Sequence, residues 1–147
     1  MKNLPHILPL FPLEGVVMFP NTYLPLNIFE PRYLKMIEHS MSQESRLIGM
    51  IQPKKSNDQN KNVDLHDVGC AGRIIKFEET EDSRYLITLK GVSRFNLLSD
   101  TINKDNFREA KINWLEFSGD LSEEGINDSF VSLKQALKHF FKFKKMF

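Results

Sequence analysis

The chain has 147 residues, of which 41% are hydrophobic and 27% are charged, as expected for one ordinary globular domain. Its formal net charge of +1 argues against a general attraction to nucleic acid. It contains no apolar run of the roughly 18 residues that a membrane helix needs, and its N-terminus lacks a signal-peptide pattern. Cys70 is its single cysteine, which excludes a disulfide framework. We therefore expect a cytoplasmic protein.

Prolines dominate the first 31 residues and divide them into short apolar runs. A proline cannot donate a backbone hydrogen bond to a neighbouring strand, so it is restricted to strand starts, edges and bulges. The prolines therefore predict short, bent strands and argue against a helix. We expect two or three such strands within the ranges 8–13, 16–19 and 24–29.

The next part of the chain predicts a helix, a strand and a loop. A helix is expected from about Pro31 to Gln43, because a proline favours the first helical position and apolar residues follow at helical spacing. Residues 46–51 are apolar and end before a proline, which predicts a buried strand. Residues 54–62 contain no apolar side chain, so we expect a mobile loop there.

The most regular part of the chain predicts a meander of strands. Residues 68–78 and 84–90 are apolar or alternating and flank a polar break, which is typical of a β-hairpin. Gly91 is expected to permit a bend into a third strand at 92–98. Residues 107–117 alternate well enough to predict one more strand.

Several of these segments carry a resemblance to a known family. The runs LPLFPL, VVMFP and LPLNIFEPRY, followed by VGCAGRI and RYLITLKGVSRF, resemble the Lon substrate-binding domain over residues 4–117. This domain is the N-terminal module of Lon-type proteases, and the stand-alone bacterial Lon-domain proteins are the more similar group. The resemblance implies an α+β fold, in which a highly bent antiparallel sheet forms a PUA-like pseudo-barrel with one helix packed on it.

The C-terminal part of the chain differs in character. We expect the Lon-like domain to span residues 1–118 and a polar linker to span 119–126. Residues 127–147 predict a helix with an apolar stripe of Phe130, Leu133, Leu137, Phe140 and Phe141. No stop signal follows, so this helix is expected to begin a truncated helical region of a longer protein. The stripe should pack on the barrel or mediate self-association.

The sequence carries no signature of catalysis. Lon proteases combine an ATPase with a serine–lysine peptidase, but the chain has no G-x-x-x-x-G-K-[ST], G-x-S-x-G or S-x-x-K motif. Its four histidines are scattered, without the spacing of metal ligands. We therefore expect no enzyme activity, no cofactor and no metal site in this chain.

Candidate binding residues lie in the bent N-terminal strands. With twelve phenylalanines, three tyrosines and a tryptophan, a domain of this size is not expected to bury every ring. An apolar groove with unpaired backbone could bind an extended polypeptide by strand addition. The candidate contacts are Phe11, Phe19, Tyr23 and Phe29. The alternative, that all four rings belong to the core, is equally consistent with the sequence.

Glu30 and Arg32 are two further candidates, because they flank the proline that opens the helix. Glu30 could complement the positive end of the helix dipole. Arg32 could pair with a carboxylate or lie over the ring of Tyr33 or Phe29. A structural role at this junction is favoured over direct contact with a partner.

Three functions remain open from the sequence. The resemblance implies a non-catalytic polypeptide-recognition or adaptor module in protein quality control, with unfolded or flexible polypeptide as its partner. RNA binding is the main rival, because PUA-like barrels also occur in RNA-modifying proteins, but the near-neutral charge argues against nucleic acid. The third possibility is a small-ligand pocket inside the barrel. A separate alternative is that the chain is the N-terminal fragment of a full ATP-dependent Lon protease.

Overall fold

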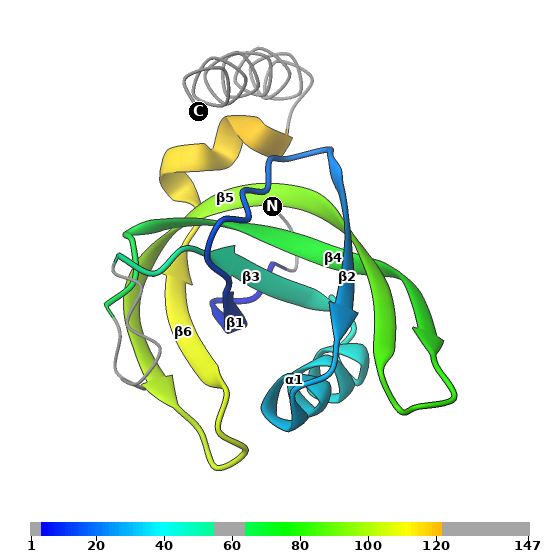
Figure 1. The fold of residues 1–147 in the computed structure, drawn as a ribbon. Helices are drawn as coiled ribbons and strands as arrows, with labels where there is room; N and C mark the ends of the chain where they lie inside the picture. Colours follow the sequence, from blue (N-terminus) through cyan, green and yellow to red (C-terminus); the bar gives the residue numbers. More distant parts are fainter. Residues whose placement is uncertain (1–3, 55–63, 122–147) are drawn as a thin grey trace, which may run out of the picture.

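The described part of the chain, residues 4–54 and 64–121 of the computed structural model, is mostly β-sheet with two helices (Figure 1). Its elements are β1 (Ile7–Pro12), β2 (Tyr23–Ile28), α1 (Pro31–Met41), β3 (Leu47–Ile51), β4 (Val68–Glu79), β5 (Tyr85–Ile102), β6 (Arg108–Asn113) and the 3-10 helix η1 (Leu115–Leu121). The strands form one six-stranded sheet in the order β2-β5-β4-β3-β1-β6.

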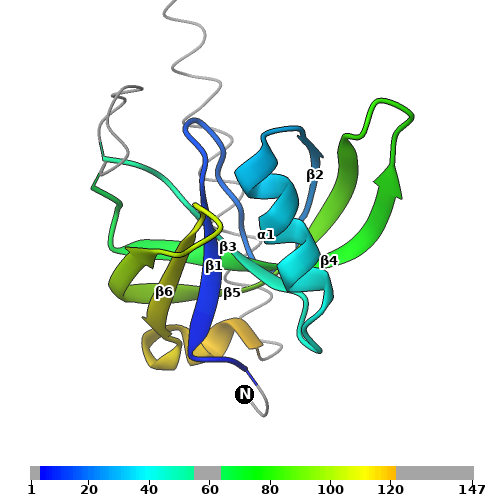
Figure 2. The ribbon, with the colours of Figure 1, turned by 90° about the horizontal axis from the view of Figure 1, so that it is seen from below.

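The sheet bends until it closes on itself, because β5 is long enough to pair at both ends. Residues 85–96 of β5 pair with β4, whereas residues 96–102 pair with β6. The strands β5, β4, β3, β1 and β6 therefore form a ring, and β2 lies outside it along the first part of β5 (Figures 1 and 2). Bulges in the β4–β5 and β5–β6 ladders increase the local twist and bend the strands.

Alternation along the strands separates two apolar cores. The interior of the ring holds one cluster, built around Phe95 and Trp114. The outer face of the same strands holds a second cluster, which α1 covers with Tyr33, Met36 and Ile37. Successive side chains of a strand point to opposite faces, so β3, which contributes to both cores, is buried along its whole length.

Several predicted elements are confirmed. The helix begins at Pro31 and ends at Met41, two residues before the predicted end. The buried strand at 46–51 corresponds to β3, and the predicted hairpin corresponds to β4 and the first part of β5. The predicted helix from residue 127 and most of the predicted loop at 54–62 lie outside the described residues.

Other predictions were wrong or incomplete. Residues 16–19 form no strand, and Gly91 does not end one, because β5 continues through it. The sheet is not purely antiparallel, since β1 and β3 run parallel. The last predicted strand is shorter than expected, because the chain turns into η1 after Asn113. Residues 119–121, which were expected to begin the linker, belong to η1.

Candidate functional site

The segment that joins β1 to β2, residues 13–22, is called the crossing segment here. It runs from β1 to the start of β2 without forming a strand (Figure 1). Near its start, the amide of Leu13 donates to the carbonyl oxygen of Ile51 at 3.1 Å, and Gln52 Nε2 donates to the carbonyl oxygen of Val16 at 3.1 Å. The buried side chain of Met18 joins the outer core and fixes the middle of the segment.

The far end of the crossing segment is held against β5 at Gly91. The amide of Asn21 donates to the carbonyl oxygen of Gly91 at 2.8 Å. The amide of Gly91 donates to the carbonyl oxygen of Thr22, also at 2.8 Å. A Cβ atom at position 91 would lie 2.0 Å from the carbonyl oxygen of Phe19, so only glycine fits there without displacement. Close backbone approach therefore requires this glycine, and a bulge between Gly91 and Ser93 places a bend in β5 at the same point.

Between these tethers, several backbone groups of the crossing segment have no partner among the described residues. Within residues 4–54 and 64–121, the amides of Val16, Val17, Met18 and Phe19 donate no hydrogen bond. The carbonyl oxygens of Val17 and Met18 accept none in the same ranges. Val17 is 59% exposed, so the segment reaches the surface at this residue, where water or a partner chain can bond to its backbone.

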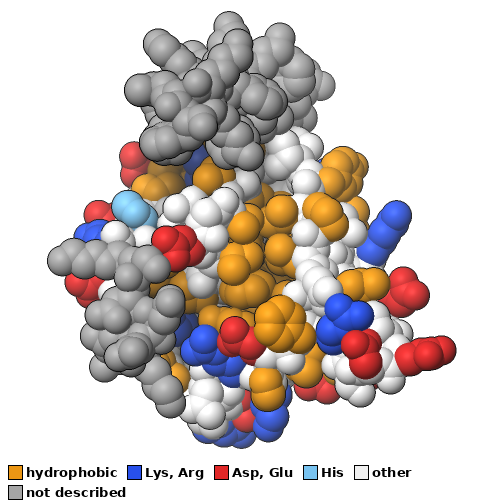
Figure 3. Space-filling model, in the orientation of Figure 1, with side chains coloured by type: hydrophobic (Ala, Val, Ile, Leu, Met, Phe, Trp, Pro, Cys, Tyr) orange, Lys and Arg blue, Asp and Glu red, His pale blue; other side chains and the backbone are white. Residues whose placement is uncertain are grey.

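A cleft of about 560 Å³ lies beside this unpaired backbone. One wall is the crossing segment, and the other consists of the end of β3, the start of β4 and Arg94. Figure 3 shows hydrophobic side chains gathered between the crossing segment and β2, where the outer core is incompletely covered. The partly buried apolar residues at the border of that core include Leu13, Val16, Leu24 and Leu26.

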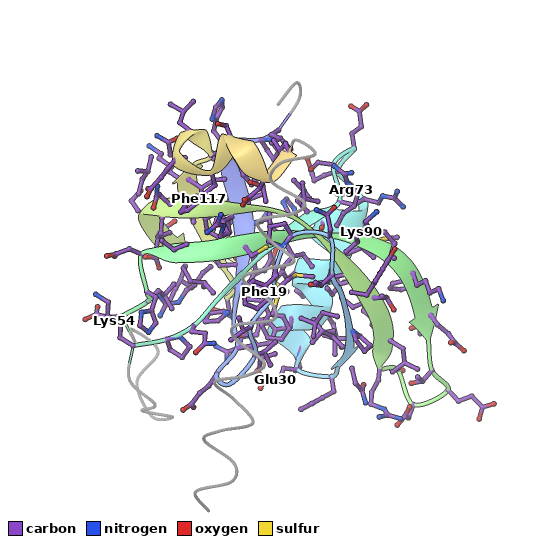
Figure 4. The ribbon with its side chains drawn as sticks, turned by 90° about the horizontal axis from the view of Figure 1, so that it is seen from above. Phe19, Glu30, Lys54, Arg73, Lys90 and Phe117 are labelled. Carbon is purple, nitrogen blue, oxygen red and sulfur yellow. The ribbon has the colours of Figure 1, made fainter. Side chains whose placement is uncertain are left out.

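The four aromatic candidates do not form one groove. Phe11 is only 7% exposed, and its ring centroid lies 4.4 Å from that of Tyr33, so it belongs to the core. Phe19 is partly buried and lines the cleft (Figure 4). Tyr23 and Phe29 are 62% and 65% exposed, but neither lines the cleft.

Glu30 and Arg32 meet at the start of α1. Arg32 Nε donates to Glu30 Oε2 at 3.1 Å, and the Arg32 guanidinium lies over the Tyr33 ring, 4.7 Å from its centroid. The carbonyl oxygen of Glu30 accepts hydrogen bonds from the amides of Tyr33 and Leu34, although its side chain does not cap the helix. Burial raises the pKa of Tyr33, and the nearby Arg32 partly offsets this effect. These contacts favour a structural role at the junction.

An ion pair with a buried carboxylate and a partly exposed guanidinium supports the cleft wall opposite the crossing segment. Asp120 of η1 is 4% exposed and accepts three hydrogen bonds of 2.9–3.0 Å from Arg94, one from its amide and two from its side chain. The Arg94 guanidinium also lies over the Phe117 ring. No local sequence signal identifies Gln52, His66 or Arg94 as cleft residues, because three separate parts of the chain contribute them.

The cysteine that lines the cleft is not activated as a nucleophile. Cys70 lines the cleft, but burial raises the pKa of the thiol to about 12, so the thiol stays neutral near pH 7 and is a poor nucleophile. The described residues hold no group of three His, Cys, Asp or Glu side chains that could bind a metal ion. None of the helices in the described ranges is long and apolar enough to span a membrane.

Comparison with known proteins identifies the family. Residues 7–146 match the ATP-dependent protease La (LON) substrate-binding domain. The Lon protease of Anaeromyxobacter dehalogenans is 23% identical over 91% of this chain, and that of Desulfosudis oleivorans is 32% identical over 74%. The chain spans only 16% and 13% of these two relatives, respectively. The matched region is non-catalytic, and their catalytic domains lie elsewhere in their chains.

Two solved structures have a similar fold. A Lon N-terminal domain protein from Xanthomonas campestris is 25% identical, with a TM-score of 0.60 over 74% of this chain and 59% of the other. The N-terminal domain of a Lon protease from the Mycobacterium avium complex is 9% identical, with a TM-score of 0.58 over 74% of this chain and 54% of the other, and shows the fold alone. The sequence match and the strongly bent sheet thus lead to the same conclusion: this chain belongs to the Lon substrate-binding domain family.

Proposed function

We propose that this domain recognises unfolded or flexible polypeptide by pairing an extended stretch of it with the crossing segment. The observation that carries the proposal is the run of unpaired amides from Val16 to Phe19 beside an apolar cleft. An added strand supplies carbonyl oxygens and amides at every second residue, so it can bond to such a backbone. Membership of a substrate-binding family of ATP-dependent proteases supports polypeptide as the ligand.

This mode of binding explains how many polypeptides could be recognised with little sequence preference. Backbone hydrogen bonds do not depend on the side chains of the bound strand. The apolar cleft adds affinity in proportion to the apolar area that it removes from water. A folded protein has already paired its strands and buried its apolar side chains, so it offers neither feature. An unfolded or flexible segment offers both.

The free edge of β2 is a less suitable docking strand than the crossing segment. The hydrogen bond from Gly91 to the Thr22 carbonyl sets the alternation of the β2–β5 ladder. Successive residues of a strand direct their backbone groups to alternate edges. Thr22 bonds to β5, so the backbone groups of Tyr23, Pro25 and Asn27 face the outer edge. Pro25 has no amide hydrogen, so it interrupts the donors in the middle of that edge.

The candidate residues have different roles in this proposal. Phe19 contacts the polypeptide in the cleft, whereas the exposed rings of Tyr23 and Phe29 bind longer chains that extend beyond it. Phe11 acts indirectly, by supporting the fold. Glu30 and Arg32 position the start of α1.

The role of the domain depends on what accompanies it. Within a chain that also carries Lon ATPase and peptidase domains, it would capture substrates for degradation. As a stand-alone protein, it would act as an adaptor. We further propose that its pseudo-barrel is of the PUA-like type, and that residues 127–147 begin a helical region through which two copies associate.

Proline substitutions test the pairing directly, because they remove a backbone amide hydrogen. A bound strand pairs with every second residue, so one of Val16→Pro and Val17→Pro should weaken binding about fivefold or more, and the other much less. Val16→Ala and Val17→Ala keep the amide and serve as matched controls. Affinity is measured by fluorescence anisotropy with a labelled, permanently unfolded polypeptide, and thermal melting confirms that each variant folds.

The proposal fails if wild-type protein binds no unfolded polypeptide, or if both folded proline variants bind as tightly as their alanine controls. Raising the salt concentration provides a second criterion. Apolar and backbone contacts should persist at high salt, whereas nucleic-acid binding should weaken steeply.

A further inference from the structure

Three side chains lie in a row across neighbouring strands of the sheet, on β2, β5 and β4. Tyr23 is paired in register with Lys90, and Lys90 is paired with Arg73 on its other side. Directly opposite residues in an antiparallel pair have Cβ atoms only about 4.5–5.5 Å apart, and like charges at this spacing repel each other. The strand register thus places two basic residues directly opposite each other on the sheet.

Neither cation is neutralised by the described protein. Within residues 4–54 and 64–121, Arg73 and Lys90 form no ion pair with a carboxylate. Arg73 Nε donates to the carbonyl oxygen of Ser45 at 3.0 Å, which orients the guanidinium and leaves its two Nη groups as donors. Lys90 Nζ lies 6.0 Å from the centroid of the exposed Tyr23 ring.

Both cations line a hollow of about 400 Å³, together with Asn21, Gly91 and Leu121. Figure 4 shows the labelled Arg73 and Lys90 next to each other on the sheet. Asp120 also contributes to the lining, but its carboxylate is buried and already bound to Arg94. The charge that this hollow offers to a ligand is therefore positive.

We propose that this hollow binds a phosphate group. A phosphate monoester carries about 1.5 to 2 negative charges at pH 7 and three acceptor oxygens, which match two cations with several free donors. A carboxylate carries one charge and would leave part of the repulsion between Arg73 and Lys90 in place. The Tyr23 ring lies beside Lys90 and offers a surface for the group that bears the phosphate. Phosphate binding here does not require polypeptide in the cleft, although the Tyr23 ring is also the one proposed above to contact longer bound chains.

Inorganic phosphate is the first probe, titrated at constant ionic strength and followed by backbone NMR shifts. The amides around Arg73, Lys90 and Gly91 should shift in the wild type. Arg73→Gln and Lys90→Gln should each weaken binding about tenfold or more, because each removes a charge-assisted hydrogen bond. Lys111→Gln makes the same charge change at an exposed position on β6 and should leave the affinity unchanged.

Thermal melting separates ligand binding from a structural role. Without phosphate, Lys90→Gln should be at least as stable as the wild type, because it removes one member of a like-charge pair. With phosphate, the melting temperature should rise in the wild type and in Lys111→Gln but not in Lys90→Gln. A variant that melts early in both conditions would show that Lys90 supports the fold, and would overturn the proposal.

Further probes distinguish the source of the phosphate from other ligands. O-Phosphoserine and a phosphoserine peptide are compared, and tighter binding of the peptide would assign the site to modified polypeptides. Binding of single-stranded RNA without binding of inorganic phosphate would overturn the proposal.

Glu123 and Glu124 follow Leu121 in the sequence. If phosphate bound only after both were changed to glutamine, the site would hold the chain's own carboxylates and the proposal would be wrong.

Discussion

The strand β1 and the crossing segment that follows it are built from similar residues but lie in different environments. β1 reads ILPLFP, and the middle of the crossing segment reads VVMFP, so both are short apolar runs limited by prolines. β1 pairs with β3 on one edge and with β6 on the other, and its side chains enter both cores. Residues 16–19 pair with no described strand, and Val17 is largely exposed.

This difference shows that pairing depends on the available neighbours more than on the run itself. β1 lies between two strands, and each of its residues is in register with β3, with β6 or with both. The crossing segment instead joins the outer core with Met18 and is tied to the sheet only near its two ends. Among the described residues its intervening amides have no strand to bond to, and the proposed polypeptide would pair with them.

The largest effect should distinguish the two regions by stability. Phe11→Ala in β1 should lower the free energy of unfolding by about 3–5 kcal/mol, because it leaves a cavity beside Tyr33. Val17→Ala in the crossing segment should change it by less than about 0.5 kcal/mol. Urea denaturation of both variants measures the contrast. Equal losses would mean that the crossing segment is as much a part of the core as β1.

The second effect concerns Cys70, which lines the cleft beside the crossing segment. Burial, followed by the nearby Asp120, raises the pKa of this thiol from its ordinary 9.0 to about 12. The neutral thiol therefore contributes stability below pH 9, and this contribution is lost as the pH rises towards 12. By pH 11 the loss should be on the order of 3 kcal/mol.

Unfolding of the wild type and of Cys70→Ala between pH 8 and pH 11 measures this loss. The variant should lose less stability over this range, because it has no thiol to ionise. Superimposable pH profiles of the two proteins would contradict the prediction. The native thiol should also react slowly with a thiol reagent at pH 8, unless the crossing segment opens.

The third test detaches the crossing segment and leaves β1 in place. Gly91→Ala would place a Cβ atom against the Phe19 carbonyl and force the two backbones apart. We expect a stability loss of about 1–3 kcal/mol and faster exchange of the Asn21 and Gly91 amides, whose hydrogen bonds hold this end of the segment, with exchange in β1 unchanged. Gly119→Ala, where an added Cβ meets no atom within 4 Å, is the control. Unchanged protection of the Asn21 and Gly91 amides would show that this contact is not what holds the segment.

The smallest effect concerns the tether at the other end. Gln52→Ala removes the hydrogen bond to the Val16 carbonyl and should cost about 0.5–1.5 kcal/mol. Thermal melting measures the loss against Gln43→Ala, which removes an exposed and longer hydrogen bond. A variant as stable as this control would mean that Gly91 alone fixes the course of the crossing segment.

Local patterns were sufficient for much of the fold. Pro31 marked the start of α1, and the alternation of Ile87 and Leu89 identified the buried face of β5. The candidate site was less accessible to sequence reasoning. Phe11 and Phe19 look alike in their proline-limited runs, but the first is in the core and the second lines the cleft. Burial of a ring depends on what packs over it, and sequence spacing does not contain that information.

The sequence by itself determined the types of element and the family, because proline geometry, apolar period and motif order are local properties of the chain. Only the tertiary structure decided which backbone groups stay unpaired and which charges meet. Gly91 is needed because Phe19, 72 positions earlier, approaches it. Arg73 faces Lys90 because of a ladder register that contains bulges. Such contacts join distant segments, and no local propensity specifies the register in which those segments meet.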